Sequence, residues 1–190
     1  MRKIIVSEFV TLDGVMEDPG GAEHFERGGW AFQFERGPEG DEFKQEETMA
    51  AGALLLGRVT YAGFAAAWPG RTGEFADKMN SMPKYVVSST LSEGKWNKTT
   101  LIKGNVEEAA ANLKAMPGGD ILVAGSGGLV NTLMQHDLVD ELRLMVYPVI
   151  LGKGKRLFQD GLERLPLRLV EAKPVGSGIL TLVYQAERKK

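Results

Sequence analysis

The sequence contains no cysteine and only two histidines among its 190 residues. The absence of cysteine excludes disulfide bonds, thiolate catalysis and cysteine-ligated zinc. Two histidines are too few for a histidine-based metal site without many carboxylates, so we expect no bound metal. The sequence also lacks an excess of charge, because its formal net charge is -2. This balance gives no electrostatic reason to expect nucleic acid or an anionic membrane as a partner.

Long hydrophobic runs are missing as well. No run approaches the length of a transmembrane helix, and the apolar run near the N-terminus is too short for a signal peptide. We therefore expect a cytoplasmic protein. The apolar content of 43% and the charged content of 25% are typical of a soluble globular protein. A chain of 190 residues is expected to form a single domain over residues 1–190.

Short apolar segments alternate with helix-like segments along most of the chain. Residues 13–40 are the exception, because seven glycines interrupt them and no periodicity is sustained. We interpret this segment as a mobile flap over a site, with a short irregular helix near residues 31–35. The alternation, closed by an antiparallel pair, predicts an α/β domain with a mixed sheet. Strands are expected at residues 3–12, 53–56, 84–87, 97–102, 121–124, 142–146, 165–175 and 178–186.

Three of the expected strands end in glycines or hydroxyl-bearing residues, at 57–60, 88–90 and 125–128. Glycine lets the backbone approach a ligand, and the free N–H groups of a helix start bind phosphate. Ser126 is also expected to cap the helix that follows it. In open α/β sheets the carboxyl ends of neighbouring strands can converge on one ligand. Tight turns without any ligand remain the alternative interpretation.

The three strand ends are suited to a dinucleotide with an additional phosphate. Two helix starts could bind the two halves of a pyrophosphate, and the hydroxyls of residues 88–90 with Arg58 could bind a phosphate monoester. This arrangement favours NADP(H) over NAD(H), although the glycine fingerprint of the Rossmann fold is missing. Six short motifs follow one another along the chain: TLDG at 11–14, LGRVTY at 56–61, VVSSTL at 86–91, AGSGGL at 124–129, LVDELRL at 138–144, and PVILGKG at 148–154 continuing to Phe158.

On these segments the sequence resembles the dihydrofolate reductase-like superfamily. More specifically, it resembles the branch of the C-terminal reductase domain of the bifunctional riboflavin-biosynthesis deaminase/reductase. It implies a three-layer α-β-α fold whose mostly parallel central sheet ends in an antiparallel hairpin. It also implies a homodimer, with the strand at 142–146 and its neighbours as the candidate interface. The implied NADPH-binding residues are Thr11, Leu56, Gly57, Arg58, Val59, Thr60, Ser88, Ser89, Thr90, Ala124, Gly125, Ser126, Gly127, Gly128 and Leu129.

The resemblance also indicates where catalytic acids would lie. Folate reductases carry a carboxylic acid on the helix before the Gly-Arg-x-Thr turn, and Asp41 and Glu42 lie at roughly that place. Asp13 would lie at the end of the first strand, beside the nicotinamide pocket. The alternatives are a helix-start charge for Asp41 and a simple Asp-Gly turn for Asp13. Because the sequence has no cysteine, the zinc deaminase chemistry of the bifunctional enzymes is not expected.

The sequence therefore predicts a reductase that transfers a hydride from NADPH to a C=N or C=O bond of a small, heterocyclic substrate. Asp13 and Asp41 are the candidate catalytic acids, and an ordered water remains an alternative proton source. Trp30, Phe34 and Trp68 could stack on a flat substrate, although aromatic side chains more often pack in a core or lid. A second hypothesis is a non-catalytic protein that binds a nucleotide or another small molecule on the same fold.

Overall fold

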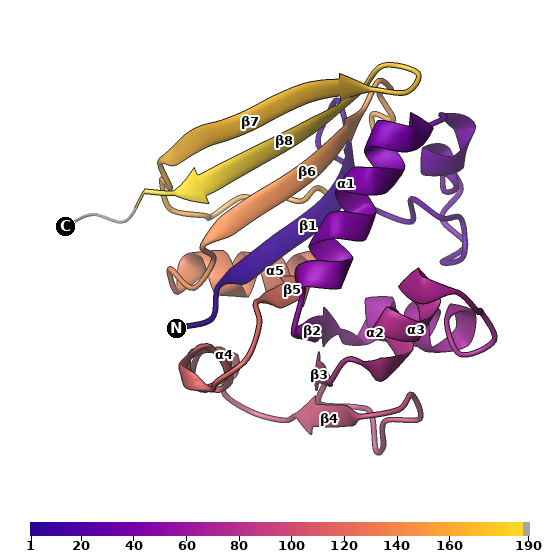
Figure 1. Ribbon diagram of the computed structural model, residues 1–190. Coiled ribbons are helices and arrows are strands. Elements are labelled where there is room, and N and C mark those ends of the chain that lie inside the picture. The colour runs from indigo at the N-terminus through magenta and orange to yellow at the C-terminus, as the bar shows by residue number, and fades with distance from the viewer. Residues whose placement is uncertain (188–190) are drawn as a thin grey trace.

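The computed structural model describes residues 1–187. Its strands form a single sheet of eight, in the order β4-β3-β2-β5-β1-β6-β8-β7 (Figure 1). The strands are β1 (Ile4–Thr11), β2 (Ala53–Gly57), β3 (Lys84–Val87), β4 (Thr99–Ile102), β5 (Ile121–Val123), β6 (Glu141–Tyr147), β7 (Leu167–Val175) and β8 (Ile179–Ala186). The helices are α1 (Gly37–Ala50), α2 (Arg58–Ala67), α3 (Glu74–Ser81), α4 (Val106–Ala115) and α5 (Gly127–Gln135), together with the 3-10 turn η1 (Trp30–Gln33).

The pairing of the strands confirms the predicted mixed sheet. Strands β1 to β6 are parallel to one another, so their carboxyl ends meet at one edge of the sheet. Strand β8 then pairs antiparallel with β6, and β7 antiparallel with β8. The strands from β4 to β6 therefore place the turns that follow β2, β3 and β5 side by side.

Helices cover both faces of the parallel part of the sheet. Apolar side chains of α4 and α5 pack with Val6, Leu55 and Val123 on one face. Side chains of α2 and α3 pack with Leu54 and Leu122 on the other face, where α1 crosses in front of β1 in Figure 1. Every residue of β2 is buried, as expected for a parallel strand covered on both sides. This confirms the predicted three-layer fold.

The segment between β1 and α1 is fastened to the segment after β6. Val15 and Arg156 form an isolated antiparallel bridge, and the Leu157 N–H donates to the Gly14 carbonyl oxygen over 3.0 Å. Lys155 adds an ion pair of 2.8 Å with Glu17. We call residues 12–34 the cover segment and residues 149–158 the partner loop. The expected short helix lies in the cover segment as η1.

Strand β6 lies inside the sheet, between β1 and β8. Leu142 and Met145 point to opposite faces, and each is only 1% exposed. The exposed part of the expected interface therefore lies on its neighbour β8 and on β7, and the homodimer stays a prediction. The exposed apolar side chains near it belong to the β7–β8 hairpin. Among residues 1–187, no helix combines the length and the hydropathy needed to cross a membrane.

Candidate functional site

A cleft of about 470 Å³ lies at the carboxyl ends of β2, β3 and β5. The first turns of α2 and α5 form two of its walls, and the turn after β3 forms another. The structure therefore brings the three predicted strand ends together around one space. The predicted residues that line the cleft are Gly57, Arg58, Val59, Ser88, Ser89, Thr90, Ser126, Gly128 and Leu129.

The two glycine turns of the cleft are bonded to each other. The Gly57 N–H donates to the carbonyl oxygen of Gly125 over 3.1 Å. A Cβ atom at Gly57 would overlap the hydroxyl of Ser126, and one at Gly125 would lie 2.5 Å from the hydroxyl of Thr60. Gly125 also has a φ of 88°, which favours glycine. The close approach of the two turns thus depends on both glycines.

Neither helix that begins at the cleft has a side-chain cap within residues 1–187. Gly57 and Ser126 occupy the N-cap positions of α2 and α5 with extended backbones. Ser126 therefore occupies the predicted N-cap position, but it forms no capping bond, because its hydroxyl lies against Gly57 instead. The N–H groups of both first turns, at the positive ends of the helix dipoles, are therefore available to an anion in the cleft.

The turn after β3 carries three hydroxyl groups, of which one stabilises the turn and two face the cleft. Ser88 is 6% exposed, and its hydroxyl oxygen accepts bonds from the N–H groups of Thr90 (3.2 Å) and Leu91 (3.0 Å). Its hydroxyl therefore shapes the turn. Ser89 and Thr90 are exposed at the cleft. Their hydroxyls are the ones that this turn presents to a ligand.

Arg58 is an exposed cation on the wall of the cleft. It has no ion-pair partner in the described part of the chain, whereas Arg36 pairs with Asp41 and Lys44 pairs with Glu47. A guanidinium without an ion-pair partner, in the same cleft as two exposed hydroxyls, is suited to a phosphate group. Arg58 therefore gives this side of the cleft a positive charge that no carboxylate neutralises.

Other predicted cofactor residues lie behind the walls of the cleft. Leu56 is fully buried in β2, and Gly127 packs closely against Met16. Thr11 is 1% exposed, and its hydroxyl accepts a bond from the Val15 N–H over 2.9 Å. These residues hold the walls in place. The predicted residues outside the lining are Thr11, Leu56, Thr60, Ala124, Gly125 and Gly127.

Asp13 joins the end of β1 to the partner loop. Its carboxylate accepts hydrogen bonds from the Thr11 hydroxyl (2.6 Å) and from the N–H groups of Leu151 (3.2 Å) and Gly152 (2.8 Å). Burial acts to raise the pKa of Asp13, but the bonds from Thr11, Gly152 and Leu151 together hold it below its usual value. The carboxylate is ionised at neutral pH, and its contacts favour a role in the turn over proton donation.

Asp41 lies on the exposed side of α1. Its side chain is 65% exposed and forms an ion pair of 2.8 Å with Arg36. The same helix turns Lys44 and Glu47 toward the sheet, where the Glu47 side chain is 1% exposed. The structure therefore places Asp41 outside the lining of the cleft, and its contacts favour the helix-start interpretation.

The three predicted stacking residues lie in two separate places. Trp30 is 1% exposed and packs edge-on against Tyr147, and Phe34 packs against the same ring. Trp68, at the end of α2, packs against Phe75 of α3. None of these three residues lines the cleft formed by the described chain. Their contacts favour the core or lid role.

Some residues of the site carried no recognisable signal in the sequence. Val87, Val106 and Thr132 line the cleft but come from the end of β3, the start of α4 and the body of α5. Glu8 was also not predicted, although it does not line the cleft. It lies within β1 and is 8% exposed. Burial raises the pKa of Glu8 to about 8, which Lys44 and the Gly125 N–H oppose and Glu47 reinforces.

A polar group on the opposite face connects β1 to α1. Lys44 donates to the hydroxyl of Ser7 over 2.7 Å, and this hydroxyl donates to Glu47 over 2.6 Å. Lys44 and Glu47 also form an ion pair. Since Ser7 is 3% exposed, the group serves to hold α1 on the sheet.

Residues 2–181 match the family model of the RibD C-terminal domain. The chain belongs to this family. The match includes every strand end that forms the cleft. It confirms the branch of the superfamily that the sequence motifs indicated. The RibD C-terminal domain family is reductase-like, as are several proteins that share its fold.

This RibD C-terminal domain protein has a relative in the uncharacterized protein YyaP of Bacillus subtilis (strain 168). The two are 32% identical over 188 residues, which cover 96% of this chain and 94% of YyaP. A second relative, YwjB of the same organism, is 29% identical over 178 residues, which cover 94% of this chain and 95% of YwjB. Both relatives therefore match along nearly their whole length.

Solved structures confirm the dihydrofolate reductase-like fold. A putative riboflavin biosynthesis protein from Shewanella sp. PV-4 has a TM-score of 0.77 at 23% identity, covering 98% of this chain and 99% of that one. Dihydrofolate reductase from Enterococcus faecalis, complexed with NADP(H), has a TM-score of 0.62 at 14% identity, with coverages of 98% and 97%. At these identities the likeness concerns the fold.

Proposed function

We propose that this protein is an NADPH-dependent reductase that transfers a hydride to a C=N or C=O bond of a small, pterin- or pyrimidine-like substrate. The observation that carries the proposal is the cleft, in which two uncapped helix starts and the unpaired Arg58 face the same space. The reductase-like family supports this function, as does the NADP(H) complex of the E. faecalis enzyme.

The residues of the cleft fit a dinucleotide phosphate. The first turns of α2 and α5 present backbone N–H groups on which the two halves of a pyrophosphate can bind. Gly128 lines the cleft, and a Cβ atom added there would meet no other atom within 4 Å, so the backbone at this point is open to a ligand. The close packing of Gly57 on Ser126 holds the two turns at a short separation.

The preference for NADPH over NADH rests on the rim beside α2. Arg58, Ser89 and Thr90 line the same cleft, and Arg58 carries an uncompensated positive charge. A 2′-phosphate would receive charge-assisted hydrogen bonds from this group, and NADH offers no such phosphate. We therefore assign Arg58, Ser89 and Thr90 to the 2′-phosphate.

The cofactor and the protein have different roles in the proposed reaction. NADPH supplies the hydride when it is bound. The chain orients it with the two helix starts, while the cover segment and the partner loop limit access of water at the carboxyl end of β1. The substrate also needs a proton. Asp13 is held as a carboxylate, so Asp41, Glu42 or an ordered water remain the candidate donors.

Thermal unfolding in the presence of each nucleotide tests the proposal. A ligand at a hundred times its dissociation constant stabilises the folded protein by about 2.7 kcal/mol. NADPH should therefore raise the melting temperature much more than NADH, which lacks the 2′-phosphate and binds more weakly. Pterins, pyrimidines and small carbonyl compounds should then be tested for substrate-dependent loss of NADPH absorbance. No shift with either nucleotide would contradict the reductase function.

A non-catalytic binding protein is the second candidate. It is favoured by one observation, that both predicted acids already have partners, Asp13 in the partner loop and Asp41 on Arg36. A melting shift with NADPH, without oxidation of NADPH by any of the substrate classes, would support this candidate instead.

A further inference from the structure

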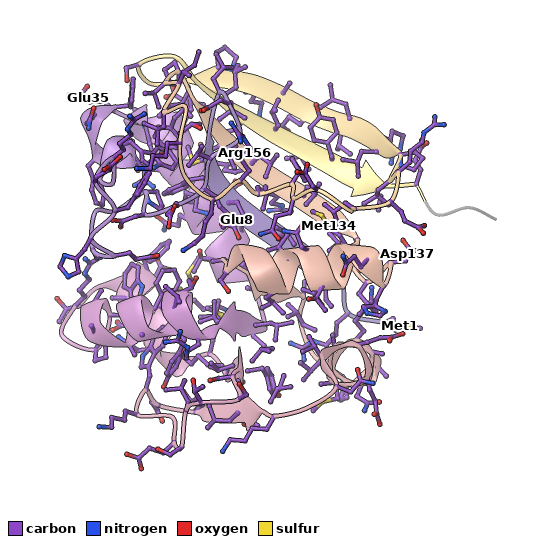
Figure 2. All side chains as sticks on the ribbon, turned by 180° about the vertical axis from the view of Figure 1, so that it is seen from behind. Met1, Glu8, Glu35, Met134, Asp137 and Arg156 are labelled. Atoms are coloured by element: carbon purple, nitrogen blue, oxygen red, sulfur yellow. The ribbon has the colours of Figure 1, made fainter. Side chains whose placement is uncertain are left out.

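Glu8 lies in β1, the strand beside β5, whose carboxyl end leads into the cleft. β1 pairs in parallel with β5, and Val6 lies opposite Val123. Continuing this register by two residues places Glu8 beside Gly125, where the chain has left β5 and enters the turn of the cleft. The Gly125 N–H acts on the Glu8 carboxyl as a hydrogen-bond donor. In Figure 2, Glu8 lies toward the end of α5 that is remote from Asp137.

The Glu8 carboxyl lacks the partners that a buried ionised group requires. Its Oε1 atom is buried and has no hydrogen-bond partner within residues 1–187. The charged groups that act on it are Lys44 and Glu47 of α1, which have opposite signs and form an ion pair with each other. With its pKa at about 8, the carboxyl carries a proton at neutral pH.

Gly125 lies between this carboxyl and the cleft. Its N–H faces Glu8, and its carbonyl oxygen accepts the bond from Gly57. Gly57 and the next residue in the turn, Ser126, both line the cleft. The Glu8 carboxyl is thus separated by a single residue from the wall on which the pyrophosphate is proposed to bind.

We propose that Glu8 is a positioning residue whose carboxyl contacts the Gly125 turn and whose protonation couples cofactor binding to the uptake of a proton. This inference rests on the proposed function, because it concerns the same cleft. When Glu8 loses its proton, a buried negative charge faces the turn, and that charge opposes the binding of a pyrophosphate. By reciprocity, a bound pyrophosphate favours the protonated carboxyl.

The sign of the pH dependence follows from this linkage. NADPH affinity should be highest below pH 8 and fall as the pH rises through this value. If cofactor binding raises the pKa of Glu8 by about one unit, the affinity falls by about tenfold across the transition. At pH 8.5, midway through the transition, about half a proton is taken up for each NADPH bound.

Titration calorimetry of NADPH at pH 8.5, in two buffers of different ionisation enthalpy, measures this uptake directly. The wild type should take up a fraction of a proton, and Glu8→Gln should take up none while binding NADPH within about threefold of the wild-type affinity at pH 7. Glu141→Gln is the matched control. Glu141 is also buried, but it lies at the start of β6 and pairs with Arg143, so this variant should keep the wild-type uptake.

The outcomes separate this inference from the proposed function. NADPH binding without proton uptake, or uptake that persists in Glu8→Gln, would overturn the role of Glu8 and leave the reductase function standing. No binding of NADPH at any pH would overturn the function and the coupling together. The Gly125 amide resonance of the ligand-free protein should shift near pH 8 in the wild type and not in Glu8→Gln, and its failure to shift would overturn the contact itself.

Discussion

The backbone N–H of Gly57 donates a hydrogen bond to the carbonyl oxygen of Gly125, and this 3.1 Å contact joins the two turns that form the cleft. One turn follows β2 and the other follows β5, which are neighbours in the sheet. The contact holds the starts of the two helices close together. Because neither helix has a side-chain cap, the N–H groups of both first turns are unpaired. The contact therefore fixes the spacing of two anion-binding helix starts.

Substitution of Gly57 should separate these turns. In Gly57→Ala the new Cβ would overlap the Ser126 hydroxyl, so we expect a loss of stability of about 1 to 3 kcal/mol and of the NADPH-dependent melting shift. Gly63→Ala is the control, since Gly63 lies within α2 with no atom near its missing Cβ. It should stabilise the protein by about 0.5 to 1 kcal/mol. Urea unfolding with and without NADPH measures both effects, and a normal NADPH shift in Gly57→Ala would contradict the assignment.

Removal of the Arg58 side chain should reduce discrimination between the two nucleotides. Hydrogen bonds to charged groups contribute about 1.5 to 3 kcal/mol, so Arg58→Ala should weaken NADPH binding by about ten- to a hundredfold. The affinity for NADH should change little. Arg71→Ala, which removes an arginine stacked over Trp68 outside the cleft, should leave both affinities unchanged. Equal losses for NADPH and NADH in Arg58→Ala would show that Arg58 does not contact the 2′-phosphate.

Asp13→Asn should destabilise the protein without abolishing hydride transfer. The substitution weakens the bonds to Thr11, Leu151 and Gly152, and we expect a loss of about 1 to 2 kcal/mol at pH 7. The folded-state pKa of Asp13 is lowered, so its stabilisation is present above its unfolded value of about 3.9 and is lost as the pH falls through the folded value. The difference between wild type and variant in urea unfolding should therefore shrink below about pH 4.

Turnover measurements on the same variant separate the two roles of Asp13. A structural role predicts that kcat stays within a few-fold of the wild type and that any change falls mainly on KM. A loss of kcat by several orders of magnitude, with normal folding at pH 7, would return Asp13 to the role of proton donor.

The proposed homodimer should use the β7–β8 hairpin instead of β6. Leu169 and Leu180 are 51% and 42% exposed, and the strand register places both on the hairpin face that carries the half-buried Leu182 and Tyr184. Sedimentation should give twice the chain mass of 20.7 kDa for the wild type and the single mass for Leu180→Lys. Leu12→Lys, at an exposed leucine elsewhere, should remain dimeric. A wild-type mass of 20.7 kDa would contradict the dimer.

The local sequence pattern was sufficient to predict the position of most strands and helices. The runs that precede Gly57 and Gly125 are apolar and short, and each glycine marks the point where a strand becomes a turn before a helix. The expected strand at 97–102 begins later, at Thr99, because residues 97–98 form a turn in which Lys98 has a φ of 56°. Such a conformation is rare for lysine, and no feature of the local pattern indicates it.

The candidate site was predictable where one segment supplies several residues. Val106 and Thr132 escaped prediction because only the order of the strands brings the start of α4 and the body of α5 to the cleft. Two of the three partners of Asp13 lie 138 and 139 positions away, so its sequence neighbourhood does not distinguish a turn from a catalytic acid. Glu8 offered a signal, since strand alternation places it on the same buried face as Val6 and Val10.

The fastening of the cover segment to the partner loop sets a limit on protein engineering. The carboxylates of Asp13 and Glu17 lie in one segment, and the N–H groups and the ammonium that they bind lie in the other. Transplanting the cover segment of a relative into this scaffold, in order to change its substrate, would leave these groups facing unmatched neighbours. A loop graft that preserves folding must therefore move both segments as one cassette.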